Sequence, residues 1–217
     1  MTKAEVKARI HELGIVPAIR VSSEEDALFA AEAVSSGGIA IVEVTTTVPN
    51  ALEVIALLRE KRAEMVVGAG TVLDTATAER AIAAGAHFLT SPNFDSKVMA
   101  VGQKAGVTVI PGALTPTEIC DAWKAGADFV KVFPCGQMGG PHYIRALRGP
   151  FPEVPLIAAG GVTQQTAGDH IRAGAAALGI GTELIPHEAI KLRQPDWIQE
   201  LAHRFLGMVK AARVQAA

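Results

Sequence analysis

AGADFVKVF, residues 125–133, has the pattern that decides the fold: a small residue with glycine, then a short apolar strand. The same unit recurs as SGGIAIVEV at 36–44, AGAHFLTS at 84–91, AGVTVIPG at 105–112 and AGAAALGIG at 173–181. Glycine just past a helix end adopts the left-handed conformation at little cost, so each unit predicts a helix that ends before a strand begins. Strands of parallel sheets are covered on both faces, and they read as apolar runs of this kind.

Three further strands fit between these units: IVPAIR at 15–20, MVVGAGT at 65–71 and VPLIAAGG at 154–161. Amphipathic segments separate the strands, for example SEEDALFAAEAVSS at 23–36 and PNALEVIALLREKR at 49–62. Ser23 is a suitable N-cap for the first of these helices, and Pro49 is suited to open the second.

Eight strands that alternate with helices imply a parallel sheet, and in 217 residues they favour a closed (β/α)8 barrel, or TIM barrel. The alternative is an open doubly wound sheet with a glycine-rich dinucleotide turn after its first strand. Here the first strand ends in RVSSEED instead. The charged start MTKAEVKARIHELG predicts an extra N-terminal helix. Without a linker-like or low-complexity tract, we expect residues 1–217 to form a single barrel domain.

Composition argues against several functional classes. The formal net charge of -2 gives no basic footprint for nucleic acid. No segment approaches the roughly 20 apolar residues of a membrane span, and the charged start does not resemble a signal peptide. The two cysteines, Cys120 and Cys135, do not make a disulfide framework, so we expect a cytoplasmic protein.

Two charges interrupt the predicted apolar strands. Glu43 lies in IAIVEVT and Lys131 in FVKVF, both late in their strands, where barrel active sites are found. Side chains alternate along a strand, so the register that turns Lys131 inward also turns Phe129 and Phe133 inward. A buried charge is costly unless it has a partner or a chemical use. A structural ion pair, or a lysine that extends outward between helices, is the alternative to catalysis.

A lysine at this position has a specific chemical use. Its neutral amine attacks a ketone and forms an iminium, which withdraws electrons from a neighbouring C–C bond. Dehydration of the first adduct and cleavage of the bond both move protons, and a carboxylate such as Glu43 in the same pocket can shuttle them. The pair therefore predicts Schiff-base aldolase chemistry on a ketone substrate.

The loops after the last two strands offer a phosphate site. Gly160-Gly161 follows the seventh strand, and Gly181 and Thr182 follow the eighth, where barrels often bind phosphate. Ordinary tight turns are the alternative, and Glu183 beside this predicted anion site is an objection to it. At the end of the first strand, Arg20 is suited to bind a carboxylate or phosphate.

Metal and thiol chemistry fit the sequence poorly. None of the six histidines lies at the end of a predicted strand or has ligand-type spacing, so we expect neither a metal nor another cofactor. Cys135 in KVFPCGQMGG has no evident histidine to activate it, and we interpret it as a loop thiol.

In combination, several motifs resemble the 2-keto-3-deoxy-6-phosphogluconate (KDPG) aldolase family, which includes enzymes that also act on 4-hydroxy-2-oxoglutarate. The resemblance covers about residues 15–185 and is carried by IVPAIR, VEVTTTVPNA, VGAGTVL, LTSPNFD, VIPGALTPTE, FVKVFPCGQMGGPHYIRALRGPFP and AAGGV. The segment KVFP with its buried lysine is the most specific of these.

The resemblance implies a class I (Schiff-base) aldolase that yields pyruvate and glyceraldehyde 3-phosphate. It implies that Lys131 forms the Schiff base and that Glu43 is the general acid/base. The substrate would be bound by the pyruvate-end residues Thr71 and Pro92 and by the phosphate-loop residues Gly160, Gly161, Gly181 and Thr182. It further implies a cytoplasmic homotrimer that needs no metal.

One position departs from the family pattern. Some members carry an arginine after the VEVT segment, and Thr47 stands at that place here. Arg20 can substitute for it from the first strand. The substrate could therefore be the galactonate-derived isomer or 4-hydroxy-2-oxoglutarate. Two other hypotheses stay open: a phosphate-binding barrel isomerase or synthase without covalent chemistry, and a non-enzymatic binding barrel.

Overall fold

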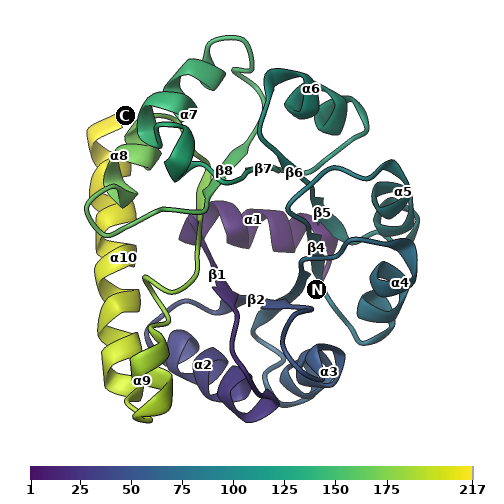
Figure 1. The fold of residues 1–217 in the computed structure, drawn as a ribbon, viewed down its shortest axis with the longest axis vertical. Coiled ribbons are helices and arrows are strands. Elements are labelled where there is room, and N and C mark those ends of the chain that lie inside the picture. The colour runs from purple at the N-terminus through teal and green to yellow at the C-terminus, as the bar shows by residue number, and fades with distance from the viewer. Residues whose placement is uncertain (217) are drawn as a thin grey trace.

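The computed structural model describes residues 1–216 and confirms the predicted TIM barrel. Its strands form one sheet in the order β5-β4-β3-β2-β1-β9-β8-β7-β6, and every neighbouring pair is parallel (Figure 1). The strands are β1 (Ile15–Ile19), β2 (Ile41–Thr45), β3 (Val66–Gly70), β4 (Phe88–Thr90), β5 (Thr108–Ile110), β6 (Gly112–Ala113), β7 (Val130–Val132), β8 (Leu156–Ala159) and β9 (Ala177–Ile180).

Strands β5 and β6 are two parts of the single strand predicted within 105–112. Pro111 separates them, because proline has no N–H for the ladder. Strand β5 pairs with β4, whereas β6 pairs with β7. The Asp128 amide also donates to the Val109 carbonyl at 3.1 Å, and the Lys131 amide donates to the Pro111 carbonyl at 2.9 Å. The two ends of the sheet therefore meet and close the barrel.

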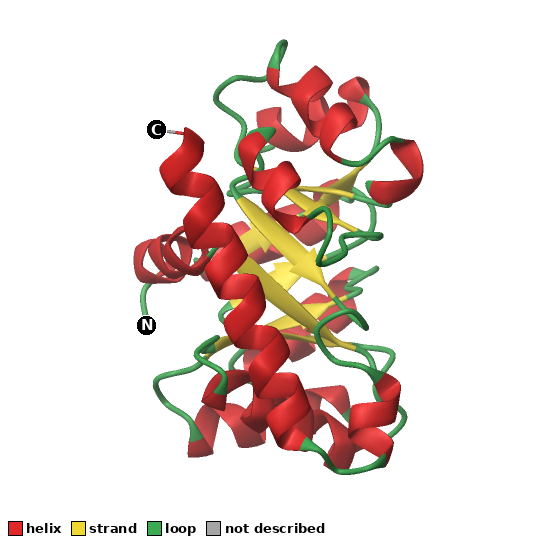
Figure 2. Cartoon of the chain, turned by 90° about the vertical axis from the view of Figure 1, so that its left-hand side faces the viewer, coloured by secondary structure: helices red, strands yellow, loops and turns green. Residues whose placement is uncertain are grey.

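Helices surround the barrel, as Figures 1 and 2 show. They are α2 (Glu24–Ser36), α3 (Ala51–Lys61), α4 (Thr75–Ala83), α5 (Ser96–Ala105), α6 (Pro116–Lys124), α7 (Pro141–Arg148), α8 (Ala167–Arg172), α9 (His187–Lys191) and the long α10 (Pro195–Ala216), with a 3-10 turn η1 at Gly136–Met138. None of the helices within 1–216 is both long and apolar enough to span a bilayer.

The two predicted helix starts have different outcomes. Ser23 is the N-cap of α2, and its hydroxyl accepts the Asp26 amide at 3.1 Å, as predicted. The prediction for Pro49 is wrong, because α3 begins at Ala51. The residue between them, Asn50, has a left-handed φ of 54° and takes the N-cap position. Asparagine tolerates that conformation better than most residues, so the chain turns into the helix there.

The predicted N-terminal helix is α1 (Lys3–Leu13), which lies across one end of the barrel (Figure 1). Its buried residues Val6 and Ile10 pack into a cluster inside the barrel. The other buried members of that cluster are Val16, Ile41, Val66, Phe88, Ile110, Phe129, Ile157 and Ala177. Most of them lie early in their strands or just before them, so α1 closes the N-terminal end and leaves the opposite end for a site.

Candidate active site

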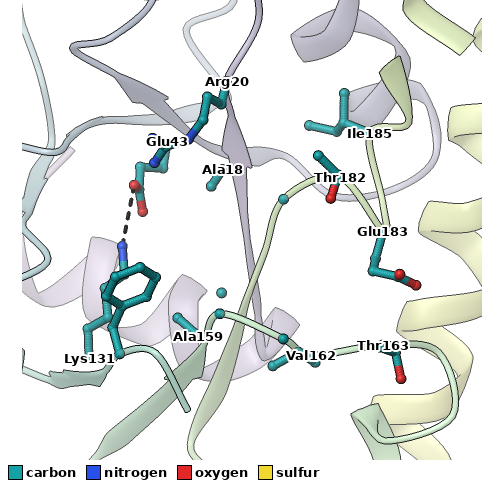
Figure 3. A pocket seen from close by; sticks show the side chains of 15 residues that line it. Ala18, Arg20, Glu43, Lys131, Ala159, Val162, Thr163, Thr182, Glu183 and Ile185 are labelled. Atoms are coloured by element: carbon teal, nitrogen blue, oxygen red, sulfur yellow. Dashed lines mark ion pairs between the residues drawn. The ribbon is translucent and has the colours of Figure 1, made fainter. Parts of the chain in front are cut away.

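A cavity of about 430 Å³ opens at the C-terminal end of the barrel (Figure 3). This is the end where TIM barrels place their active sites. It is lined by Ala18, Arg20, Glu43, Lys131, Phe133, Ala159, Gly160, Gly161, Val162, Thr163, Gly179, Gly181, Thr182, Glu183 and Ile185. The cavity thus brings together both charges that interrupt the predicted strands and all four predicted phosphate-loop residues.

Lys131 points inward, in the register that places Phe129 and Phe133 on the same side. Its neighbour Phe129 belongs to the interior cluster, whereas Val130 and Val132 belong to the outer core between strands and helices. The Lys131 Nζ lies 3.6 Å from Glu43 Oε1, and the two side chains are 14% and 4% exposed. The Phe133 ring centroid lies 5.6 Å from the same Nζ. The ammonium is therefore held between a carboxylate and an aromatic ring and faces the cavity.

The position of the Glu43 carboxylate depends on a glycine in the neighbouring strand. A Cβ added to Gly70 of β3 would lie 2.1 Å from Glu43 Oε1 and 2.5 Å from its Cγ. Strand β2 pairs with β3 so that Thr45 is opposite Gly70. The glutamate side chain therefore lies over the end of β3, in space that any other residue at position 70 would occupy.

The glycine pair after β8 packs against the loop that follows Lys131. Gly160 and Gly161 have left-handed φ values of 78° and 82°. The Gly136 amide donates to the Gly160 carbonyl at 2.7 Å, and a Cβ on Gly136 would lie 2.9 Å from the Cα of Gly161. The glycines thus allow two loops to approach each other closely at the cavity wall.

Among the other predicted substrate residues, only Arg20 lines the cavity. Figure 3 shows its side chain directed toward Glu43 and away from Thr182. Thr71 directly follows β3 with a φ of 59°, and its carbonyl accepts the Thr46 hydroxyl at 2.8 Å. Pro92 follows β4 by two residues, and its carbonyl carbon would lie 2.2 Å from a Cβ on Gly112. Both therefore lie at the same end of the barrel but outside the cavity wall.

Thr163 and Phe133 also line the cavity but were not predicted as site residues. The Thr163 amide donates to the Thr166 hydroxyl at 3.0 Å rather than to a strand. Its place directly after the glycine pair and Val162 was the available signal, but the sequence VTQQTAG indicated only a helix start there. For Phe133, the signal was its alternation with Lys131.

The Cys135 thiol next to this cavity is buried and is not ionised at neutral pH. Burial raises its pKa to about 11, and its Sγ donates to the Gly140 carbonyl at 3.6 Å. A thiol of this kind is a poor nucleophile, which agrees with its interpretation as a loop thiol. Within residues 1–216, no three His, Cys, Asp or Glu side chains are grouped so that they could hold a metal ion.

Comparison with known proteins identifies the family. A family model described as KDPG and KHG aldolase, where KHG is the hydroxy-oxoglutarate substrate, matches residues 6–201. The chain belongs to this aldolase family. The KDPG aldolase of Pseudomonas aeruginosa is 31% identical over 90% of this chain and 88% of its own. The KHG/KDPG aldolase of Escherichia coli is 30% identical over 87% of this chain and 88% of its own.

A solved aldolase structure extends this similarity to the fold. The KDPG aldolase from Legionella pneumophila superposes with a TM-score of 0.85 and is 32% identical, covering 91% of this chain and 96% of its own. Its structure was determined with pyruvate captured at low pH as a covalent carbinolamine intermediate. The family-model match at residues 6–201 includes both the barrel strands and the loops that form the cavity.

Proposed function

We propose that this protein is a class I aldolase that cleaves KDPG to pyruvate and glyceraldehyde 3-phosphate, with Lys131 as the nucleophile. The observation that carries the proposal is the Lys131–Glu43 pair, whose Nζ and Oε1 lie 3.6 Å apart and which lines the cavity at the C-terminal end of the barrel. The relatives' activity supports it. The E. coli relative's name supports 4-hydroxy-2-oxoglutarate as a second substrate, cleaved to pyruvate and glyoxylate.

The first chemical stage forms the iminium. A proton passes from the Lys131 ammonium to Glu43, and the neutral amine then attacks the C2 ketone of the substrate. This attack forms a C–N bond, and a proton then moves from the nitrogen to the oxygen to give a carbinolamine. The Glu43 carboxyl then protonates the carbinolamine hydroxyl, which departs as water. This leaves the iminium and restores the Glu43 carboxylate.

The second stage breaks the C3–C4 bond. The Glu43 carboxylate takes the proton of the C4 hydroxyl, and the electrons of the C3–C4 bond flow into the iminium to give an enamine. The aldehyde leaves, and the Glu43 carboxyl returns its proton to C3. Water then hydrolyses the new iminium, which releases pyruvate and the free lysine. One carboxylate therefore serves each proton transfer in turn.

The remaining residues bind the substrate in this proposal. Arg20, Thr71 and Pro92 hold the keto-acid end; for Arg20, its direction toward Glu43 in Figure 3 is the support. The phosphate is held by the loop residues Gly160, Gly161, Gly181 and Thr182, which line the same cavity as Lys131. By family resemblance we also propose a cytoplasmic homotrimer in which each chain is a single domain.

Trapping with borohydride tests the covalent step. Incubation with pyruvate and sodium borohydride should reduce the imine and add about 72 Da to Lys131, which peptide mass spectrometry locates. Lys131→Arg keeps the positive charge but cannot form the imine, so it should lose both the adduct and KDPG cleavage. Lys124→Arg, on the outer helix α6, is the matched control and should keep both.

The same variants separate covalent from non-covalent chemistry. An adduct on another lysine, or KDPG cleavage retained by Lys131→Arg, would contradict the proposed role of Lys131. Retained cleavage would instead favour the phosphate-binding barrel without covalent chemistry.

A further inference from the structure

Charge is distributed unevenly along the cavity. One end, the lysine end, holds Lys131 and Glu43, with Arg20 directed toward them (Figure 3). The other end, the glycine end, is formed by the loop residues 160–163 and 181–183, and it contributes no lysine, arginine or histidine to the cavity wall. Its one charged side chain is Glu183. An anion at the glycine end therefore lies near a negative charge that no cation in this part of the cavity wall offsets.

The Glu183 charge is not neutralised by an ion pair. No basic side chain within residues 1–216 comes within ion-pair distance of its carboxylate. In Figure 3 the side chains of Glu183 and Thr163 both lie on the side of the cavity opposite Lys131. The side chain is exposed, so it is hydrated in the free protein and can reorient when a ligand enters.

A phosphate and a hydroxyl would interact with this end in opposite ways. A phosphate monoester carries a charge of about -1.5 to -2 at neutral pH and offers mainly acceptor oxygens, so Glu183 repels it. A sugar hydroxyl is neutral and can donate to the Glu183 carboxylate in a charge-assisted hydrogen bond. The hydroxyls of Thr163 and Thr182 line the same end and can donate or accept. These three side chains can therefore bind a polyol tail better than a phosphate loop made only of glycines could.

We infer that Glu183 is a specificity-determining residue that reduces the advantage of a terminal phosphate. The unphosphorylated 2-keto-3-deoxy sugar acid is then a second substrate of the same cavity. Its keto-acid end reacts at Lys131 as KDPG does, and its terminal hydroxyl binds at Glu183. This inference rests on the proposed aldolase function, and it names a substrate class for that site.

The test is a ratio of specificity constants. The kcat/KM for KDPG divided by the kcat/KM for unphosphorylated 2-keto-3-deoxygluconate is measured for the wild type and for Glu183→Gln. The substitution removes the charge but keeps the shape and a hydrogen-bonding group, so the ratio should rise about tenfold. Added salt screens the repulsion, so it should raise the ratio in the wild type more than in Glu183→Gln.

Glu188→Gln is the matched control, because Glu188 is an exposed carboxylate on α9 that does not line the cavity. It should leave the ratio unchanged. Cleavage of KDPG by the wild type with the same ratio in Glu183→Gln would overturn this inference and leave the aldolase function intact. An equal rise in Glu188→Gln would also overturn it, since general surface charge would then explain the effect. Absence of cleavage of both acids by the wild type would overturn the proposed function and this inference with it.

Discussion

Gly70 controls the position of the Glu43 carboxylate. Strand β3 runs directly beside β2, and the glutamate side chain occupies the space where a residue at position 70 would place its Cβ. The backbone at Gly70 and the side chain of Glu43 have little room to move, because both residues are buried. Relief of a contact at 2.1 Å therefore requires the carboxylate to leave its position beside Lys131.

We predict that Gly70→Ala lowers kcat for KDPG by about 100-fold, because misplacement of a catalytic group by about 1 Å can cost that much. Steady-state kinetics measure the loss, and borohydride trapping with pyruvate should be slowed in parallel. Gly207→Ala is the control: a Cβ there meets nothing within 4 Å, and it lies in the helix α10. That variant should keep full activity and gain up to about 1 kcal/mol of stability. Undiminished kcat in Gly70→Ala would show that Glu43 does not need this position.

The residue scale also shows what sequence can reveal about the site. Lys131 and Glu43 were visible as charges in apolar strands, and alternation predicted that Phe129 and Phe133 would share the direction of Lys131. Gly70 was not visible as a site residue, because its role depends on the register between β2 and β3. Thr163 was missed for a related reason: its place in the cavity follows from the fold of the loop after β8, which local pattern does not determine.

At the scale of elements, the strands were predictable, whereas their breaks and the starts of some helices were not. The apolar run within 105–112 predicted one strand, but Pro111, which has no N–H for the ladder, divides it into two parts that pair with different neighbours. Pro49 is a common helix-opening residue, yet α3 starts after Asn50, whose side chain donates to Glu24 at 3.4 Å. That partner comes from the preceding helix, so it becomes apparent only once the helices are packed.

Asp128 connects two elements at the closed end of the barrel. Its carboxylate accepts the Val109 amide of β5 at 3.0 Å. It also pairs with Lys3 at 2.8 Å and Lys7 at 3.2 Å, both on α1. The carboxylate therefore fixes the helix that covers the interior cluster to the strand where the sheet closes.

We predict that Asp128→Ala lowers the free energy of unfolding by about 2–3 kcal/mol, because it leaves the buried Val109 amide without its side-chain acceptor and α1 without two ion pairs. Asp128→Asn keeps an acceptor for that amide and should cost about 1 kcal/mol, since partly exposed ion pairs contribute little. Urea denaturation measures both values, and KDPG cleavage should change less than twofold because the cavity is at the other end.

The matched control is Asp121→Ala, which removes an exposed carboxylate from α6 and should change stability by less than about 0.5 kcal/mol. Equal losses in Asp128→Ala and Asp128→Asn would contradict this explanation, because the ion pairs to Lys3 and Lys7 would then carry the whole effect.

At the scale of the whole molecule, buried histidines make stability depend on pH. Burial lowers the pKa of His87 to about 4, with smaller contributions from Arg59 and the N-terminus. Burial is also the main cause of the lowered pKa of His170, which is fully buried. The His87 Nδ1 accepts the Val67 amide at 3.2 Å, so a proton on that nitrogen would break the bond. Each of these histidines is thus neutral in the folded protein at neutral pH.

Lowered histidine pKa values weaken the fold as the pH falls. The unfolded chain binds a proton at each histidine near a pKa of about 6.5, whereas folded His87 resists protonation until about pH 4. The stabilisation is therefore complete above the unfolded pKa and is lost as the pH falls through this window. For His87 alone, we predict a loss of about 2 kcal/mol in the free energy of unfolding between about pH 7 and pH 5.

His87→Asn isolates this contribution, because the asparagine Oδ1 can accept the Val67 amide as Nδ1 does but does not titrate. The substitution can change stability at pH 7 through packing, so the loss from pH 7 to pH 5 is compared within each variant by urea denaturation. His142→Asn removes an exposed histidine on α7 and should lose as much as the wild type. His87→Asn should lose about 2 kcal/mol less.

Carboxylates such as Glu118, whose pKa is lowered by backbone hydrogen bonds, titrate at more acid pH and do not account for a loss in this range. The same loss in all three proteins would therefore mean that His87 takes up its proton in the folded state as readily as in the unfolded chain, and that the Val67 bond does not hold it neutral.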